Sequence, residues 1–193
     1  MPIFTRSLFL LALTTASLLT SCSDKNEEPA PTPDPAPTYA LSHYFYYPAT
    51  NGAAAVIHPN QDITGKAQLH PTVLALDFEA KADMPHFEIE RAQLKPDWKG
   101  VYPLRCRARP ADPVFVSYSY HTDGYRIFRF SDFTQTLTGH VTITAYDTKR
   151  QLISGTYEVQ APGQTDPLEF SIDTKCDITL SGSFTDLKVK PQP

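Results

Sequence analysis

Acidic residues at alternating positions are the side chains in this sequence best suited to acid–base catalysis. Asp77 and Glu79 alternate with apolar residues, and so do Glu88 and Glu90. A glycosidase needs two carboxylates that face each other across a cleft, and these usually come from different elements. Two acids on the same side of one strand instead indicate its solvated face. An envelope hydrolase that uses Asp and Glu residues remains the alternative function.

Histidines are the other candidates for catalysis or metal binding. They are scattered along the chain, at His43, His58, His70, His86, His121 and His140. His121 and Asp123 flank one turn, but two ligands are too few for a metal site, so a polar turn is the simpler interpretation. The sequence contains no His-Glu-x-x-His, Gly-x-Ser-x-Gly, phosphate-loop or Cys-x-x-Cys motif. We therefore expect no metal, no cofactor and no catalytic residue.

Two sets of side chains could bind a partner. The basic set is Arg105, Arg107 and Arg109. The aromatic set is Tyr44, Tyr46, Tyr118 and Tyr120. Alternating arginines either pair with acids of a neighbouring strand or present a basic stripe to an anionic partner. Exposed tyrosines could stack on sugar rings or a protein surface, and the alternative is that they pack against the end of the domain.

Cys22 is the one residue whose neighbours indicate a specific covalent modification. Residues 1–21 contain a single charge at Arg6, an apolar run and two small polar residues, which is typical of a signal peptide. The apolar run is about twelve residues long, whereas a transmembrane helix needs roughly 20. The residues Leu19-Thr20-Ser21-Cys22 resemble the lipobox of bacterial lipoproteins, in which the cysteine sulfur receives a diacylglyceryl group. The alternative is an ordinary signal peptide followed by a structural cysteine.

The segment after Cys22 looks like a tether. An acidic run at 23–28 is similar to the export signal of surface lipoproteins in Bacteroidota, which implies the outer membrane and either surface display or the periplasmic face. Proline then occupies every second position from 29 to 37, which favours an extended polyproline-II spacer. The predicted organisation is a signal peptide at 1–21, a lipidated cysteine and linker at 22–38, and one β-rich domain at 39–193.

Composition excludes some partners. Hydrophobic residues make up 41% of the 193 residues, and 17 Lys and Arg stand against 21 Asp and Glu, for a net charge of -4. An acidic chain offers no positive field for nucleic acid, so we expect no nucleic-acid partner.

A period of two in hydrophobicity predicts an all-β domain. The expected strands are 44–47, 53–57, 72–80, 86–91, 102–109, 114–121, 125–130, 140–146, 153–159, 168–173 and 176–184. Asn51-Gly52 predicts a hairpin turn between the first two strands. Short antiparallel strands at this spacing favour a β-sandwich, with a closed β-barrel as the alternative.

Two further cysteines predict a disulfide. Cys106 and Cys176 are each in phase with apolar residues of their strands, so both sulfurs should face the core in an oxidising compartment. The alternative is a pair of buried free thiols.

The C-terminal half carries a family resemblance. The segments Gly139–Asp147, Ile153–Tyr157 and Gly182–Phe184 resemble a pattern in a family of uncharacterised Bacteroidota lipoproteins. That resemblance implies a β-rich exported domain and brings no catalytic residue. Gly155 lies within a predicted strand, where a bulge or a close neighbour is expected. Together these features predict a lipid-anchored, non-enzymatic envelope domain that binds a protein or glycan partner or has a structural role.

Overall fold

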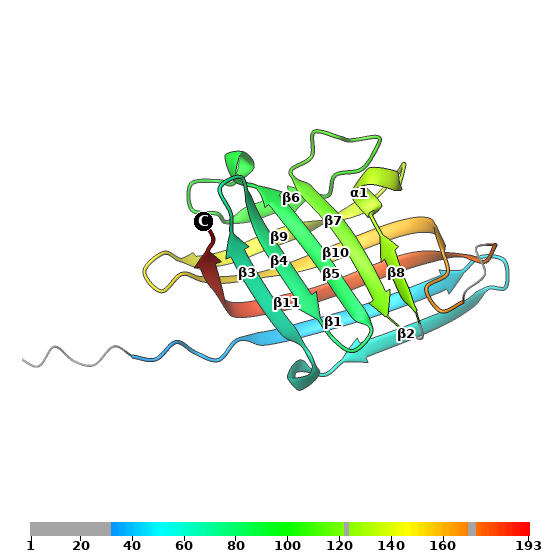
Figure 1. Ribbon diagram of the computed structural model, residues 1–193, viewed down its shortest axis with the longest axis horizontal. Helices are drawn as coiled ribbons and strands as arrows, with labels where there is room; N and C mark the ends of the chain where they lie inside the picture. The colour runs from blue at the N-terminus through cyan, green and yellow to red at the C-terminus, as the bar shows by residue number, and fades with distance from the viewer. Residues whose placement is uncertain (1–31, 122–123, 170–172) are drawn as a thin grey trace, which may run out of the picture. The chain divides into compact units, whose positions relative to one another are not determined.

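Antiparallel β-strands form most of the structure, which is a computed structural model describing residues 32–121, 124–169 and 173–193 (Figure 1). The strands are β1 (Thr38–Tyr47), β2 (Gly52–His58), β3 (Thr64–Leu69), β4 (Val73–Glu79), β5 (Asp83–Glu90), β6 (Gly100–Pro103), β7 (Val114–His121), β8 (Tyr125–Phe128), β9 (Thr138–Asp147), β10 (Leu152–Thr165) and β11 (Lys175–Pro191). Short helical turns occur at η1 (Asn60–Asp62), η2 (Arg91–Gln93) and α1 (Phe130–Phe133). The predicted all-β class is confirmed.

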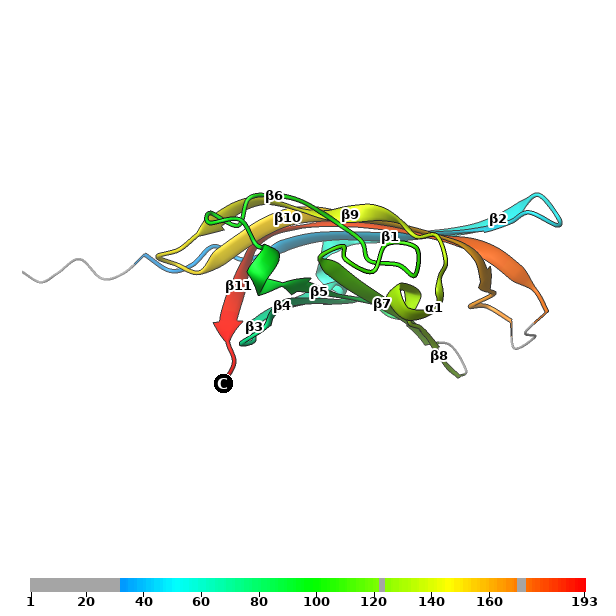
Figure 2. The ribbon, with the colours of Figure 1, turned by 90° about the horizontal axis from the view of Figure 1, so that it is seen from above.

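The strands of Asp34–Pro193 form two layers (Figure 2). Sheet A has the order β2-β1-β11-β10-β9-β6, and sheet B continues as β3-β4-β5-β7-β8. The long strand β11 belongs to both, because its last residues, Val189–Pro191, pair in parallel with β3. Asp186, whose φ of 55° lies in the left-handed region, precedes this change of partner, and β11 still pairs with β10 at Leu187 and Lys188. The path ends at β6 and β8 without closing, so the architecture is the predicted sandwich and not the alternative barrel.

The core lies between the two sheets and consists largely of the side chains that alternate inward along each strand. In β5 every second residue from Asp83 is buried, and its partners in β4 and β7 are buried in phase with it. Aromatic rings meet across the layers: the Tyr157 ring centroid lies 5.0 Å from that of Phe78 and 4.9 Å from that of Phe87. The predicted outward acids, Asp77 and Glu79, lie on the opposite face of β4.

Glycines allow close backbone approach where β10 and β11 meet their neighbours. A Cβ at Gly155 would overlap the Thr142 carbonyl oxygen, and the β10 register shifts at this residue, so the expected bulge is confirmed. A Cβ at Gly182 would overlap the Tyr157 hydroxyl and the Ala40 carbonyl oxygen. Any larger residue would push these strands apart.

Some predicted strands differ from the structure. The strand expected at 102–109 ends with β6 at Pro103, and the chain continues as a loop to Val114. Residues 168 and 169 are not strand, and the rest of that prediction, to 173, lies largely outside the described residues. β3 was not predicted, because its sequence Thr-Gly-Lys-Ala-Gln-Leu has little β propensity.

The predicted disulfide is absent. Cys106 and Cys176 are both free and buried. Both sulfurs are within the core as expected. Cys106 lies in the loop after β6, where its backbone forms an isolated β-bridge with Arg109, whereas Cys176 lies on β11 opposite Gln164 of β10 in sheet A. Strand phase predicts the face on which a residue lies and not its distance from a residue on another element.

The predicted signal peptide, Cys22 and most of the proline-rich linker lie outside the described residues. Residues 32–37 are described and have no regular secondary structure, and β1 begins at Thr38. No helix within the described part of the chain is both long and apolar enough to cross a membrane.

Candidate functional site

The outer face of sheet A carries polar side chains in rows that cross the strands. Tyr44 on β1 lies opposite Thr179 on β11, which lies opposite Gln160 on β10, which in turn lies opposite Thr138 on β9. These four residues share one face because each is in phase with outward neighbours on its own strand. Tyr46 is two residues along β1 and lies opposite Asp177.

These side chains line an open groove with a volume of about 410 Å³. Its lining residues are Tyr44, Tyr46, Thr136, Thr138, Gln160, Ala161, Pro162, Asp177, Ile178 and Thr179. Tyr44 is 44% exposed, so much of its ring is available to a ligand. Thr138 donates a hydrogen bond of 3.0 Å from Oγ1 to Gln160 Oε1, and the Tyr46 hydroxyl donates one of 2.9 Å to Asn51 Oδ1. The groove therefore combines aromatic rings with oriented amide and hydroxyl groups.

The other predicted aromatic residues are not on this surface. Tyr118 and Tyr120 are buried, and both face the core from β7 in phase with Val116. Of the two alternatives for these residues, packing within the domain applies and the exposed platform does not; alternation with Ser117 and Ser119 indicates two faces and does not say which one is covered.

The three arginines do not form a stripe. They lie in the loop that follows β6, where Arg105 forms an ion pair with Glu90 of β5. Arg109 contacts Asp112 at 2.9 Å, from Nε to Oδ2, and its guanidinium also donates to the Leu137 carbonyl oxygen. Arg107 is exposed. Pairing with an acid is thus observed for Arg105 and Arg109, but from a loop and not across a strand pair.

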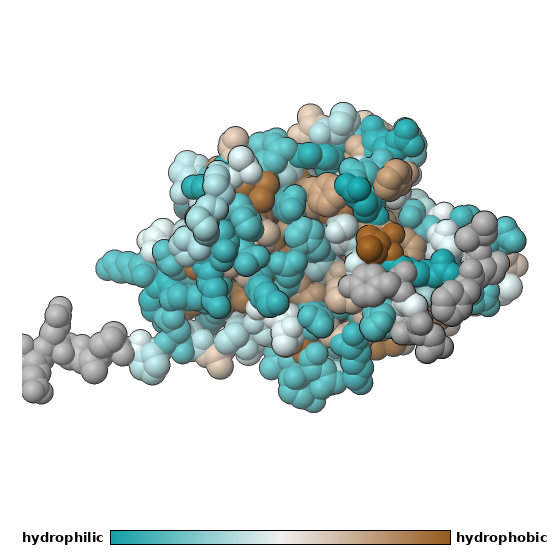
Figure 3. Space-filling model, viewed as in Figure 1, coloured by the Kyte–Doolittle hydropathy of each residue, from teal (hydrophilic) through white to brown (hydrophobic). Residues whose placement is uncertain are grey.

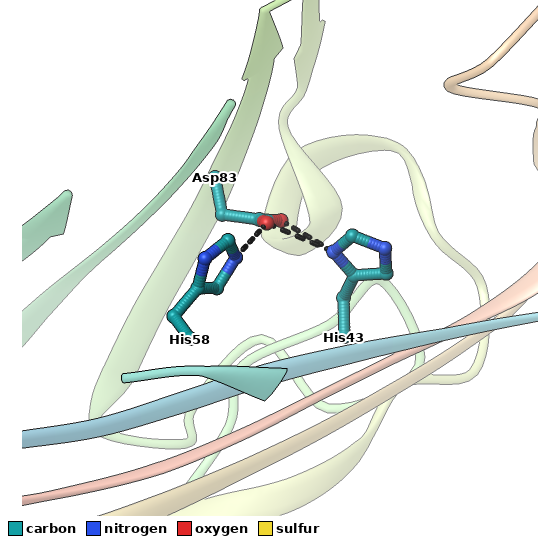
Figure 4. A group of neighbouring side chains, drawn as sticks. All are labelled: His43, His58 and Asp83. Atoms are coloured by element: carbon teal, nitrogen blue, oxygen red, sulfur yellow. Dashed lines mark hydrogen bonds and ion pairs between the residues drawn. The ribbon is translucent and has the colours of Figure 1, made fainter. Parts of the chain in front are cut away.

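A buried cluster of His43, His58 and Asp83 joins the two sheets (Figure 4). Asp83 is fully buried, and the two histidines are 4% and 5% exposed. His43 Nδ1 lies 2.8 Å from Asp83 Oδ2, and His58 Nε2 lies 2.6 Å from the same oxygen. Because a carboxylate accepts hydrogen bonds, each ring nitrogen donates to it.

Three chain segments position this cluster. His43 is on β1 between the inward residues Leu41 and Phe45, and His58 ends β2 opposite Leu41, so both face the core from sheet A. Asp83 begins β5 in sheet B, after a turn in which Lys81 has a φ of 51°. The backbone of Asp83 is held by two hydrogen bonds with Ala80, each 2.9 Å long.

Aromatic residues surround the cluster. The His43 ring stacks on Phe45 with centroids 4.1 Å apart, and Tyr120 meets His43 edge-on at 5.7 Å. The Tyr118 hydroxyl donates a hydrogen bond of 2.5 Å to Asp83 Oδ1. Burial of Asp83 raises its pKa, but the hydrogen bonds from His43 and Tyr118 outweigh burial, so the pKa of this carboxyl is lowered. Burial and the charge of Asp83 raise the pKa of Tyr118, which keeps its hydroxyl protonated as a donor.

The outer face of sheet B has a different character. The face formed by β3, β4, β5 and β7 is largely hydrophilic (Figure 3). His86 lies there between two acids, with Nδ1 2.6 Å from Asp77 Oδ1 and Nε2 3.3 Å from Glu88 Oε1. The hydrogen bond to Asp77 raises the pKa of His86 in spite of partial burial.

The buried cluster was not predicted from the sequence, whose motifs indicated no metal site. The position of His43 between Leu41 and Phe45 was a usable signal, because alternation places all three on one face. The hairpin at Asn51 then places His58 near it. Nothing local identified Asp83, because it meets the histidines only through packing of the two sheets.

No protein-family model and no curated protein matches this chain. The family resemblance of the C-terminal half therefore stays a prediction.

Proposed function

We propose that this protein is a lipid-anchored module of the bacterial cell envelope that binds a glycan in the groove on the outer face of sheet A. The observation that carries the binding role is that Tyr44 and Tyr46 line one groove together with the polar row of Thr179, Gln160 and Thr138. Sugar rings present apolar C–H faces that pack on aromatic rings, and hydroxyl groups that bond to amides, carboxylates and hydroxyls.

The size and polarity of the groove suit such a ligand. Its volume of about 410 Å³ lies within the range of small-molecule sites, roughly 300–1,000 Å³. Asp177, which lies opposite Tyr46, supplies a carboxylate at the groove while also accepting a hydrogen bond of 2.8 Å from the Gly163 amide. A short segment of a glycan chain fits this description better than a large flat protein partner does.

The tether part of the proposal rests on the sequence. The signal peptide, the lipobox ending at Cys22 and the proline-rich linker predict a protein held on the outer membrane by acyl chains, displayed either at the surface or in the periplasm. The resemblance to Bacteroidota lipoproteins supports the same location. Replacement of Cys22 by Ala should move the protein from the membrane fraction to the soluble fraction. Continued membrane association of the Cys22→Ala variant would refute the lipid anchor.

The hydrolase alternative depends on the acids of sheet B, where Asp77 and Glu88 flank His86; both carboxyl side chains are 40% exposed and lie at an open surface, not in a water-excluding cleft. The buried cluster contains a single carboxylate, that of Asp83, and this side chain is not exposed to a substrate. A two-carboxylate mechanism needs a second acid about 5–9.5 Å away across an accessible cleft. A binding module is therefore the better interpretation.

Binding can be tested by screening the full chain on an array of bacterial and host oligosaccharides. The Tyr44→Ala variant should bind the selected oligosaccharide about tenfold more weakly, which corresponds to about 1.4 kcal/mol of lost stacking. Thr144 is an exposed residue of β9 outside the groove, so Thr144→Ala is the matched control and should bind normally. Equal affinity of Tyr44→Ala and wild type would show that the groove is not the binding site.

A further inference from the structure

The buried cluster has the composition of a site for a divalent transition metal. Two imidazole nitrogens and one carboxylate are ligands that Zn²⁺ and similar ions take in proteins. The three ligand atoms, His43 Nδ1, His58 Nε2 and a carboxylate oxygen of Asp83, all lie within 4.8 Å of one another. They come from three segments that the fold brings together, so the cluster is a product of tertiary structure and not of a local turn.

The spacing of these atoms suits an ion after small shifts. Ligands around a tetrahedral Zn²⁺, with bonds of about 2.0–2.1 Å, lie about 3.3–3.4 Å from one another. The observed separations from Asp83 Oδ2 are 2.8 Å for His43 and 2.6 Å for His58. An ion at this position requires the Asp83 carboxylate and each histidine nitrogen to move apart by roughly half an ångström to an ångström, which rotations of the side chains can supply.

The charge of the cluster also favours a cation. A fully buried carboxylate is costly unless a cation or several donors accompany it. Among the described residues, Asp83 accepts hydrogen bonds from His43, His58 and Tyr118, and its ion pairs involve the two histidines and no Lys or Arg. A divalent ion would supply positive charge directly at the carboxylate while both imidazoles stay neutral, the form in which histidine binds metals.

Neighbouring residues hold the ligands in place. Tyr118 donates to Asp83 Oδ1, which orients the carboxylate and leaves Oδ2 directed at the histidines. Phe45 stacks on the ring of His43 and restricts its rotation. Such outer contacts are a regular feature of protein metal sites.

We propose that His43, His58 and Asp83 bind a divalent transition metal, with Zn²⁺ the representative ion, and that Tyr118 positions the carboxylate. The ion connects the β1–β2 hairpin of sheet A to the start of β5 in sheet B and so has a structural role. Its burial separates it from the groove at Tyr44, and the inference does not depend on the proposed glycan binding.

The test uses the full chain, purified in detergent without a polyhistidine tag, and titrated with Zn²⁺ and Co²⁺. We expect one ion per chain with a Kd of about 1 µM or tighter, a Co²⁺ spectrum typical of nitrogen and oxygen ligands, and a Tm about 5–10 °C higher at about 100 times the Kd. Failure to bind either ion, or Zn²⁺ binding without any rise in Tm, would overturn the proposal.

Variants identify the ligands. His58→Gln keeps an N–H donor near Asp83 but removes the metal-binding nitrogen, so it should fold and bind Zn²⁺ more than about 100-fold more weakly. Tyr118→Phe should weaken binding by about 10–100-fold. The matched control is His86→Gln, which removes a histidine that lies beside two acids at the surface and should leave binding unchanged. Binding that is lost in His86→Gln and retained in His58→Gln would place the ion at the surface and refute the site.

Discussion

Two buried tyrosines provide a direct test of the polar contact between the sheets. The Tyr118 hydroxyl donates to the buried carboxylate of Asp83, whereas the Tyr157 hydroxyl has no hydrogen-bond partner in the described part of the chain. Both side chains are nearly inaccessible, and both rings pack in the aromatic core. Replacement of each by Phe removes one oxygen and leaves the ring. The two variants therefore differ mainly in that only Tyr118→Phe loses a hydrogen bond.

The expected effects have opposite directions. A hydrogen bond to a charged group contributes about 1.5–3 kcal/mol, so Tyr118→Phe should lower the free energy of unfolding by about that amount. Tyr157→Phe removes a hydroxyl that is buried without a partner, so it should be neutral or stabilise the fold by about 1 kcal/mol. The two variants should therefore differ by about 1.5–4 kcal/mol.

Urea unfolding at neutral pH in the presence of a chelator measures this difference. Circular dichroism and the fluorescence of Trp98, which stacks on Tyr146 at 3.9 Å, give two independent signals. With a urea m value of about 1–3 kcal/mol/M, the midpoints of the two variants should lie at least about 0.5 M apart. Equal destabilisation by both substitutions would show that the bond from Tyr118 to Asp83 contributes nothing beyond the loss of a hydroxyl, and the reasoning would be wrong.

Other predictions concern pH, thiol reactivity and packing. Asp77 raises the pKa of His86 above its ordinary value of 6.5, so this pair stabilises the fold fully below pH 6.5 and loses its contribution as the pH rises through the folded pKa. An NMR titration of His86 should give a midpoint above 6.5, and the Asp77→Asn substitution should lower that midpoint. Burial raises the pKa of Cys176 to about 12, so a thiol reagent should modify it only after unfolding, and rapid reaction of the native protein would contradict its burial. Gly182→Ala should destabilise the fold by about 2–3 kcal/mol, whereas Gly163→Ala, at a φ of 66° with open space around it, should cost only about 1 kcal/mol of backbone strain. Urea midpoints that fall equally for both variants would show that the close packing at Gly182 relaxes.

Strand phase was sufficient to predict most of the sheet. The segment 114–121 matches β7 at both ends, and its neighbour β5 alternates between buried and half-buried residues as its sequence indicates. Strand phase was misleading at 102–109, where arginines alternate with Leu104, Cys106 and Ala108 in a loop. Proline at positions 103, 110 and 113 removes backbone donors and limits strand pairing there. Alternation alone did not reveal this, because a loop that packs on the core can also bury Leu104 and Cys106.

The groove and the buried cluster also differ in how far strand phase could predict them. Tyr44 and Tyr46 were predicted as binding residues, and the structure brings both to one groove, because their position depends only on the phase of one strand. The partners that complete the groove, such as Gln160, required the register of β10 on β11. Asp83 required the packing of one sheet on the other, which no local pattern encodes. The distance along the chain between His43 and Asp83, and the absence of a spacing motif, left the cluster undetected.

The buried cluster and the groove depend on the same register of β1. His43 faces the core and the next residue, Tyr44, faces outward, so a slip of β1 by one residue against β11 would exchange their faces. It would place a tyrosine beside Asp83 and leave a buried carboxylate without one of its donors, at a cost of about 1–3 kcal/mol or more. It would also place Phe45, which has no hydroxyl group, at the position where Tyr44 lines the groove. The contacts of His43 and His58 with Asp83 thus disfavour the slipped register, and in doing so they hold Tyr44 and Tyr46 on the face where we propose that the ligand binds.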